Sequence, residues 1–265
     1  MIDFTTSNSF LLSICIPTFN RADLLERLIE SICSAGENAA LKKIEIVIGD
    51  DGSTDKTAAI ISAYQLEKKL NIVYHKQENS GRGVALINAI KIARGKFVML
   101  LDSDDLFVRG SISYILKNLD KIQEDGSLIG AVFSTLIINL DGTKQKNSLI
   151  EGMVCNLIEL IADYGYKKDL KQTVRREILS LVIQRRGCVE RRIPTYLWWA
   201  QTVEYGNVEC FSDPVVIKEY QENGMTANIS RLKMQNPKSM FDLYKYLACS
   251  PHYKSLMYRG RAYIA

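Results

Sequence analysis

Residues 95–105 read GKFVMLLDSDD, and the expected fold follows from this stretch. Residues 97–101 form an unbroken apolar run of strand length, which ends in Asp102, Ser103, Asp104 and Asp105. A strand that is apolar on both faces lies inside a parallel sheet, and its last residues reach the carboxyl edge, where open α/β sheets bind ligands. We therefore predict an interior strand that delivers acids to a binding site.

Three carboxylates within four residues repel one another, so we expect a positive partner beside them. Carboxylate oxygens suit Mg²⁺ or Mn²⁺, with phosphate oxygens completing the coordination shell. The alternative role is structural, with Asp104 and Asp105 capping a helix that begins near Ser111 or lying in a solvated turn. The acids alone leave both interpretations open.

The composition is that of an ordinary globular protein of 265 residues, with 47% apolar and 24% charged residues. The net charge of +4 is uneven: residues 166–192 carry nine Lys or Arg against three Asp or Glu, and residues 225–265 carry seven against one. This basic second part predicts an anionic surface or substrate.

The expected location follows from three further features. The six cysteines form no C-x-x-C pair, which favours a reducing compartment. No apolar run approaches the roughly 20 residues that span a bilayer, and residues 1–10 lack the pattern of a signal peptide. We expect a cytoplasmic protein without a nucleic acid partner, with the inner face of the cell membrane as a second location.

Strand and helix patterns alternate along the first part of the chain. Apolar runs predict strands at 10–16, 44–48, 72–75 and 97–101. Helical periodicity predicts helices from Asp23 to about residue 36, from Thr54 or Asp55 to about residue 70, and over 84–93. Such spacing makes βαβ units with right-handed crossovers, which place every strand-to-helix loop at one sheet edge. The loops at 17–21, 50–53 and 102–105 should therefore converge.

The second part of the chain is less regular. We predict a strand over 129–140 followed by a hairpin turn at Asp141 and Gly142. Helices are expected over 149–163, over 170–184 and from Tyr196 to about residue 205. Two further strands, 208–211 and 215–220, are expected on either side of Asp213 and Pro214.

Four motifs occur in order: PTFNR at 17–21, DDGS at 50–53, ENSGRG at 78–83 and DSDD at 102–105. In this order and spacing they resemble the family 2 glycosyltransferases of the GT-A fold, closely over about residues 11–110. EYQENGMTAN at 219–228 is similar to the closing segment of members that build bacterial surface polysaccharides.

The resemblance implies an α/β, Rossmann-like and mostly parallel sheet flanked by helices. It implies a nucleotide-sugar-binding half over 1–141 and an acceptor-binding half of the same domain over 142–228. Residues 229–265 are then expected to form a basic, amphipathic helical tail.

The resemblance also implies roles for the motif residues. It implies nucleotide-sugar binding by Pro17, Thr18, Phe19, Asn20, Asp50, Asp51, Asn79, Gly81, Arg82, Asp102 and Ser103. It implies that Asp102 and Asp104 hold Mg²⁺ or Mn²⁺ at the diphosphate, with Asp104 contributing to catalysis through that ion. Structural alternatives remain for Asp50 and Asp51, as helix caps, and for Arg82, as a solvated side chain.

The catalytic base is the least certain position. Inverting members of the family use an acidic residue after a Phe/Ile-Pro pair, and Thr195 occupies that place here. Glu190 is the nearest substitute and is our predicted base, with Glu204 and Glu209 as weaker candidates. Among the acids of the strand-end motifs DDGS and DSDD, Asp105 is the one without an assigned role.

Trp198 and Trp199 are predicted to face the acceptor, because aromatic rings stack on sugars. Adjacent helical residues point about 100° apart, so at most one of the two can do so, and core packing is expected for the other.

Together these features predict single-displacement transfer with inversion, from a nucleotide-sugar, UDP-sugar above all, to a saccharide or lipid-linked acceptor. The product would be a surface polysaccharide such as O-antigen or capsule. The alternative is a catalytically impaired domain that binds a nucleotide-sugar or polysaccharide. A nucleotidyltransferase or a dinucleotide-binding dehydrogenase would need a glycine-rich loop after the first strand, which PTFNR does not provide. The tail from Met225 is expected to contact an anionic membrane or to pack as an ordinary helix.

Overall fold

The computed structural model describes residues 10–147, 149–162, 170–184, 190–219 and 234–252. The strands are β1 (Leu12–Thr18), β2 (Ile44–Asp50), β3 (Ile72–Lys76), β4 (Phe97–Leu100), β5 (Asp105–Phe107), β6 (Leu128–Ile138), β7 (Lys144–Lys146), β8 (Val154–Cys155), β9 (Lys171–Arg175) and β10 (Asn207–Glu219). The helices are α1 (Ala22–Ala35), α2 (Asn38–Leu41), α3 (Thr57–Glu67), α4 (Arg82–Ile92), α5 (Ser111–Glu124), α6 (Leu157–Ala162), α7 (Arg176–Gln184), α8 (Thr195–Gln201), the 3₁₀ turn η1 (Thr202–Glu204) and α10 (Pro237–Cys249).

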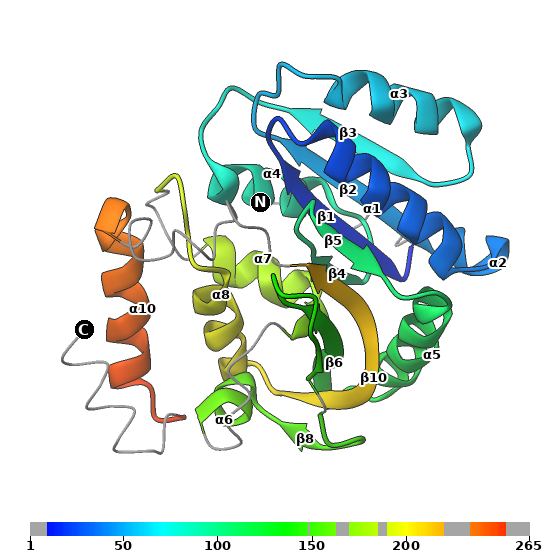
Figure 1. Cartoon of the computed structure of the whole chain (residues 1–265). Coiled ribbons are helices and arrows are strands. Elements are labelled where there is room, and N and C mark those ends of the chain that lie inside the picture. The colour runs from blue at the N-terminus through cyan, green and yellow to red at the C-terminus, as the bar shows by residue number, and fades with distance from the viewer. Residues whose placement is uncertain (1–9, 148, 163–169, 185–189, 220–233, 253–265) are drawn as a thin grey trace.

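The strands of the described residues form one sheet in the order β3-β2-β1-β4-β9-β6-β10-β5. Figure 1 shows how this sheet curls. β3, β2, β1 and β4 run parallel. The antiparallel strand β9 then joins β4 to β6, and β10 runs parallel to β6. β7 pairs with β6 and β8 with β10, at the far end of the sheet. This is the α/β architecture that the sequence predicts, with both halves on one sheet.

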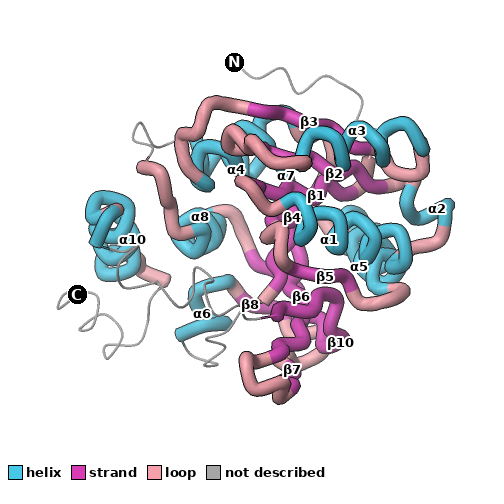
Figure 2. The backbone as a smooth tube through the Cα atoms, turned by 45° about the horizontal axis from the view of Figure 1, so that its top comes forward, coloured by secondary structure: helices cyan, strands magenta, loops and turns pink. Residues whose placement is uncertain are grey.

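Helices cover both faces of the sheet, as Figure 2 shows. Successive side chains of a strand point to opposite faces of the sheet, and each face has its own hydrophobic core. Ile14 and Met99 belong to the core under α1 and α5, whereas Cys15 and Val98 belong to the core under α4, α7 and α8. Strands buried on both faces are continuously apolar, which is why the short runs in the sequence identify them. None of the helices in the described ranges is long and apolar enough to cross a membrane.

The first half agrees with the predicted elements to within a few residues, and the second half corrects three of them. Residues 171–175 form strand β9, which pairs with Phe97 of β4 and Gly130 of β6, so the predicted helix begins only at Arg176. The predicted helix over 149–163 is reduced to α6, preceded by β8. The strands expected on either side of Pro214 are one strand, β10, whose register shifts at Phe211 and Pro214 absorb the proline.

The hairpin turn at Asp141 and Gly142 is confirmed, because β6 pairs with β7 and Gly142 has a φ of 79°. The proposed division at residues 141 and 228 stays a prediction. The sheet bears on the first of these boundaries. Strand β9, from residues 142–228, lies between β4 and β6, from residues 1–141, so these two segments share a hydrophobic core.

Candidate active site

The strand-to-helix loops of the parallel strands meet at one edge of the sheet, as predicted. Thr18, Asp50 and Lys76 are in register at the ends of β1, β2 and β3, and the amide of Asp51 donates to the carbonyl of Thr18 at 2.9 Å. A cavity of about 970 Å³ opens beside these loops. Its lining residues are Pro17, Thr18, Phe19, Arg21, Asp51, Asn79, Gly81, Arg82, Asp102, Ser103, Glu190, Arg191, Arg192, Gln235 and Asn236.

The first loop presents both apolar and polar groups to the cavity. Phe19 is 45% exposed there. The hydroxyl oxygen of Thr18 is buried and has no hydrogen-bond partner among the described residues, so it can bond to a ligand. Asn20 does not line the cavity; with a φ of 50° its side chain accepts from the amide of Thr54 at 2.8 Å. Asn20 therefore ties the first loop to the second.

The two acids after β2 have different environments. Asp51 lines the cavity, and its Oδ1 accepts from the amides of Ser80 at 2.8 Å and Gly81 at 3.0 Å. Asp50 is fully buried outside the cavity and accepts from the amide of Ser53 at 2.8 Å and the hydroxyl of Tyr74 at 2.5 Å. Burial and the carboxylate of Asp50 raise the pKa of Tyr74. Asp51 thus shapes the cavity wall, and Asp50 holds the loop from behind.

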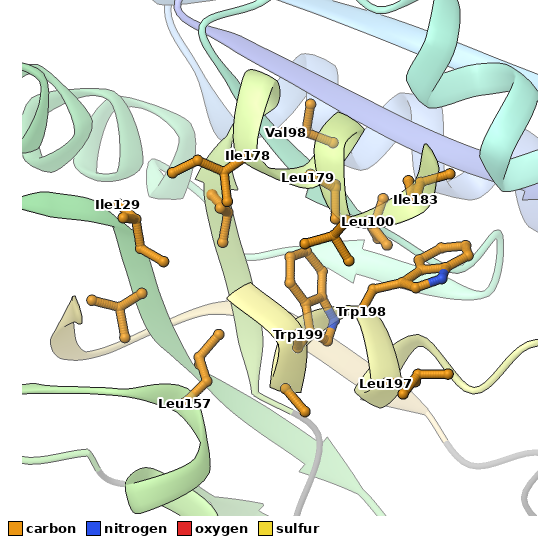
Figure 3. Close-up of a cluster of buried hydrophobic side chains, with 14 of the residues drawn as sticks. Val98, Leu100, Ile129, Leu157, Ile178, Leu179, Ile183, Leu197, Trp198 and Trp199 are labelled. Atoms are coloured by element: carbon orange, nitrogen blue, oxygen red, sulfur yellow. The ribbon is translucent and has the colours of Figure 1, made fainter. Parts of the chain in front are cut away.

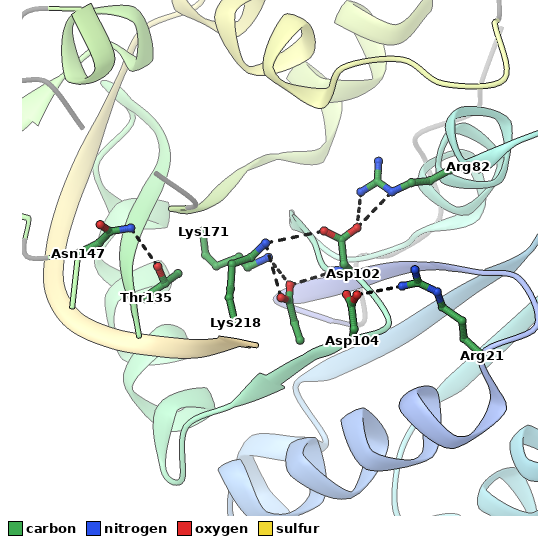
Figure 4. Close-up of polar contacts among 9 residues, drawn as sticks. Arg21, Arg82, Asp102, Asp104, Thr135, Asn147, Lys171 and Lys218 are labelled. Atoms are coloured by element: carbon green, nitrogen blue, oxygen red, sulfur yellow. Dashed lines mark hydrogen bonds and ion pairs between the residues drawn. The ribbon is translucent and has the colours of Figure 1, made fainter. Parts of the chain in front are cut away.

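Every acid of the DSDD motif pairs with a cation of this chain, as Figure 4 shows. The pairs are Arg82 Nη2 to Asp102 Oδ1 at 2.5 Å, Lys218 Nζ to Asp102 Oδ2 at 3.8 Å, Arg21 Nη1 to Asp104 Oδ2 at 3.0 Å, and Lys171 Nζ to Asp105 Oδ2 at 2.6 Å. Burial opposes the charge on Asp102, but Arg82 and Lys218 outweigh it and hold the pKa of this carboxyl far below its usual value. The positive partner expected from the sequence is therefore present within the protein.

The same acids bear on metal binding. The described residues contain no group of three His, Cys, Asp or Glu side chains that could hold an ion. Asp102 lines the cavity, whereas Asp104 is not among the lining residues; its side chain is 21% exposed and pairs with Arg21, which does line the cavity. Two carboxylates suit an Mg²⁺ or Mn²⁺ ion that takes its remaining ligands from a bound diphosphate and water. The described residues therefore form no metal cage of their own, and both carboxylates are paired with cations of the chain.

Residues 190–192 of the second half cross residues 78–83 of the first, the ENSGRG motif, which we call the glycine-rich loop. The amide of Gly83 donates to the carbonyl of Arg191 at 3.2 Å, and a Cβ on Gly81 would lie 2.3 Å from that oxygen. The Arg191 side chain donates to the backbone carbonyl of Asn79 at 3.1 Å and to its side-chain oxygen. The sequence interpretation assigned no site role to Arg191, Arg192, Arg21, Gln235, Asn236, Lys171 and Lys218. The glycines at 81 and 83 were the one sequence signal that another backbone segment comes close to this loop.

Glu190, the predicted base, lies in the cavity wall with both carboxylate oxygens engaged. They accept from the amides of Ser239 at 2.6 Å and Lys238 at 3.2 Å, in the first turn of α10. Burial disfavours the charge, but these hydrogen bonds prevail and lower the pKa of Glu190. The weaker candidates lie outside the cavity: Glu204 accepts from the hydroxyl of Tyr246 at 3.1 Å, and Glu209 lies within β10.

Trp198 and Trp199 both lie in the hydrophobic core, 1% and 5% exposed, as Figure 3 shows. Both indole side chains belong to a buried cluster with Leu100 of β4 and with Leu179 and Ile183 of α7. Neither ring lines the cavity, contrary to the expectation that one of them faces an acceptor.

Comparisons with known proteins place this cavity in context. Residues 13–182, well over half of the chain, match the family model described as glycosyl transferase family 2. The chain is 31% identical over 147 residues to the GalNAc(5)-diNAcBac-PP-undecaprenol beta-1,3-glucosyltransferase of Campylobacter jejuni, covering 54% of this chain and 43% of that protein. The chain spans less than half the length of the curated relatives it matches.

Two solved structures share the fold. S. aureus TarS 1-349 in complex with UDP-GlcNAc superimposes with a TM-score of 0.70 at 18% identity, covering 95% of this chain and 70% of that one. The mannosyltransferase PcManGT from Pyrobaculum calidifontis, in complex with GDP-Man and Mn²⁺, superimposes with a TM-score of 0.62 at 17% identity, covering 100% of this chain and 72% of that one. These similarities establish the GT-A fold.

Proposed function

The chain belongs to glycosyl transferase family 2, and we propose that it moves a sugar from a nucleotide-sugar to a saccharide or lipid-linked acceptor in cell-surface polysaccharide synthesis. The observation that carries this proposal is the cavity at the carboxyl edge, where the loops after β1, β2 and β4 meet beside the glycine-rich loop. Its lining combines an exposed ring, Phe19, with charged groups, as a nucleoside joined to a diphosphate requires.

A UDP-sugar is the preferred donor. One structural neighbour is described with UDP-GlcNAc and another with GDP-Man, so the fold itself accepts either nucleotide. The C. jejuni relative is named for an undecaprenol-linked substrate, which supports a lipid-linked acceptor. UDP-sugars are the more frequent donors in the family that the motifs resemble, and this frequency is the basis of the choice.

Asp102 and Asp104 are the residues that would hold a divalent ion. Such an ion stabilises negative charge that develops on a departing diphosphate. Arg82, which donates to Asp102 through Nε at 3.2 Å and Nη2 at 2.5 Å, would keep this carboxylate ionised and oriented. The protein thereby supplies fixed charges of both signs at the place where the leaving group accumulates charge.

Transfer by single displacement with inversion needs a carboxylate that removes the acceptor proton. We propose Glu190 for this role, because it lies in the cavity wall beside the donor loops. Its lowered pKa keeps it ionised at neutral pH, although its hydrogen bonds to α10 occupy lone pairs that a base would use.

The test of the function is a donor panel. We expect calorimetry with UDP, GDP and dTDP, in the presence of Mn²⁺, to show tightest binding to UDP, and the matching UDP-sugars to be consumed when acceptor is supplied. Tightest binding to GDP would contradict the preferred donor. Failure to bind any nucleoside diphosphate would contradict the proposed function.

A second candidate function is binding without transfer. Thr195 at the family's acidic position and the engagement of Glu190 with α10 favour it. The discriminating result is donor binding with neither transfer nor hydrolysis, for every donor in the panel and with both metals. Turnover above the rate without protein would exclude this candidate.

A further inference from the structure

Two arginines from different halves of the chain meet at the cavity. Arg82 begins α4, and Arg192 is the last residue of the segment 190–192 that crosses the glycine-rich loop. The backbone amide of Arg192 donates to Asn236 Oδ1 at 3.0 Å, so this residue is positioned by the turn that precedes α10. Each half contributes two arginines to the lining, Arg21 and Arg82 from the first and Arg191 and Arg192 from the second. Arg21 is paired with Asp104, and Arg191 donates to Asn79.

The two guanidinium groups differ in their partners. Arg82 shares its charge with Asp102. Arg192 has a buried Nη1 with no hydrogen-bond partner, and no ion pair within the described ranges of the chain. Burial lowers the pKa of Arg192, the nearby charge of Arg82 lowers it further, and Asp102 works in the opposite direction. A buried guanidinium nitrogen without a hydrogen-bond partner is unfavourable unless a bound acceptor joins it.

A bound anion with more than one negative oxygen would satisfy this arrangement. Guanidinium groups bind phosphate through two parallel N–H donors, and two of them together match a diphosphate better than a monovalent anion. Gln235 also lines the cavity, and its side chain carries an amide donor.

We propose that Arg192 acts with Arg82 as the pair that binds the diphosphate of the nucleotide donor, so that the second half supplies its own cation to donor binding. This assignment rests on the proposed function. It adds a group that no sequence motif indicates, because Arg192 lies in a basic run whose default is a solvated surface.

The experiment compares Arg192→Gln with wild type in the full-length chain, by calorimetry with UDP, GDP, uridine, guanosine and inorganic pyrophosphate. We expect the variant to bind the preferred nucleoside diphosphate and pyrophosphate about 10- to 100-fold more weakly, and the nucleoside unchanged. Arg192→Lys keeps the positive charge but lacks the two parallel N–H donors of a guanidinium group, so it should recover part of the lost affinity. Arg109→Gln removes the same charge from an exposed site outside the cavity and should bind like wild type.

Thermal unfolding of the ligand-free protein gives an independent readout. Because Arg192→Gln removes a partly buried, unpaired charge, its unfolding temperature should equal or exceed that of wild type, whereas a merely structural arginine would lower it. If Arg192→Gln does not fold, Arg192→Lys takes its place, with weaker UDP binding and unchanged uridine binding expected.

The failures are distinguishable. Wild-type affinity for UDP and pyrophosphate in Arg192→Gln would overturn the role of Arg192 and leave the proposed function standing. Equal weakening of the nucleoside and the nucleoside diphosphate would overturn it as well, because the loss would then come from distortion of the cavity. A wild-type chain that binds neither nucleoside diphosphates nor pyrophosphate would overturn both proposals.

Discussion

Gly81 is the residue on which the two halves come closest. Its φ of 102° and ψ of 155° belong to a region that is almost exclusive to glycine. Its amide donates to both carboxylate oxygens of Asp51, at 3.0 and 2.9 Å. A side chain here would therefore disturb the backbone, the cavity wall and the contact with Arg191 at once.

We expect Gly81→Ala to weaken binding of UDP at least about tenfold and to destabilise the fold by about 1–3 kcal/mol, measured by calorimetry and denaturant unfolding. The matched control is Gly142→Ala, since Gly142 also has a positive φ, 79°, but no atom within 4 Å of an added Cβ. The control should lose stability only, with UDP binding intact. Normal binding by Gly81→Ala would show that the close approach is not needed.

Asp104 carries the metal prediction. Asp104→Asn keeps the size of the side chain but removes its charge, so Mn²⁺-dependent binding of UDP should fall at least about tenfold while binding of uridine persists. Asp120→Asn, at an exposed carboxylate paired with Lys43, is the control. Unchanged Mn²⁺ dependence in Asp104→Asn would remove this residue from the metal site.

The sequence could identify the site residues that end strands, and not those that depend on distant contacts. Asp51 and Asp102 were predictable because a carboxylate at the end of a buried strand has to emerge at the sheet edge. Asp50 looks the same in the sequence, yet Tyr74 from the next strand covers it. Arg192 gave no local signal, since its place depends on Asn236, far along the chain.

At the scale of elements, α10 is tied to the cavity through Glu190. The carboxylate accepts two amides of the first turn of α10, which is the arrangement of an N-terminal cap. Because its pKa is lower in the folded protein than in the unfolded chain, Glu190 contributes stability that is present above about pH 4.3 and lost as the pH falls below it. The cap and the proposed base are therefore the same group.

Glu190→Gln separates these roles. Loss of the cap should cost about 1 kcal/mol of unfolding free energy, and loss of a base should reduce turnover about 10²- to 10⁴-fold with UDP affinity nearly intact. Because the pKa of Glu190 is lowered, wild-type turnover should also show no acid limb above about pH 4.5 if this residue is the base.

Glu177→Gln, in the exposed first turn of α7, is the control and should change neither property. Destabilisation without loss of turnover would leave Glu190 as a cap and move the base to Glu204. A chain that turns over with all three glutamates replaced would need a base outside this set.

The elements that the sequence misassigned are those whose pairing decides their conformation. Residues 171–175 continue into α7 without a local break, and only antiparallel pairing with β4 and β6 makes them a strand. Strand β10 continues through Pro214 because its pairing with β6 shifts register there, and such an irregularity accommodates a residue that has no amide hydrogen to donate. The parallel strands were predictable because their apolar runs are complete in themselves.

At the scale of the whole molecule, α10 presents one face to the core and another outward. Leu243 and Leu247 are each 6% exposed, whereas Phe241 is 64% exposed; Met234, which precedes α10, is 75% exposed. Lys238 and Lys245 also lie on exposed positions of α10. We propose from this pattern that the outer face of α10 contacts an anionic membrane, while its inner face packs as an ordinary helix. Residues 220–233 and 253–265, which include most of the 219–228 motif and the rest of the predicted tail, lie outside the described residues.

Co-sedimentation with vesicles tests this contact. We expect more protein on anionic than on neutral vesicles, and Phe241→Ser to weaken the anionic binding about tenfold, because one exposed aromatic ring contributes about 1.5 kcal/mol or more when buried. Leu66→Ser, at an 81% exposed position on α3, is the control for a lost apolar side chain. Equal binding of Phe241→Ser and wild type would exclude α10 as the contact.

The crossing of residues 190–192 over the glycine-rich loop also has a consequence for hydrogen–deuterium exchange. Separation of this crossing would expose amide hydrogens from distant parts of the sequence, those of Gly83, Arg192, Lys238 and Ser239. They should therefore exchange at a common rate, as one opening unit. A ligand that occupies the cavity would then slow exchange in the first turn of α10, and the start of that helix would report on the nucleotide without touching it.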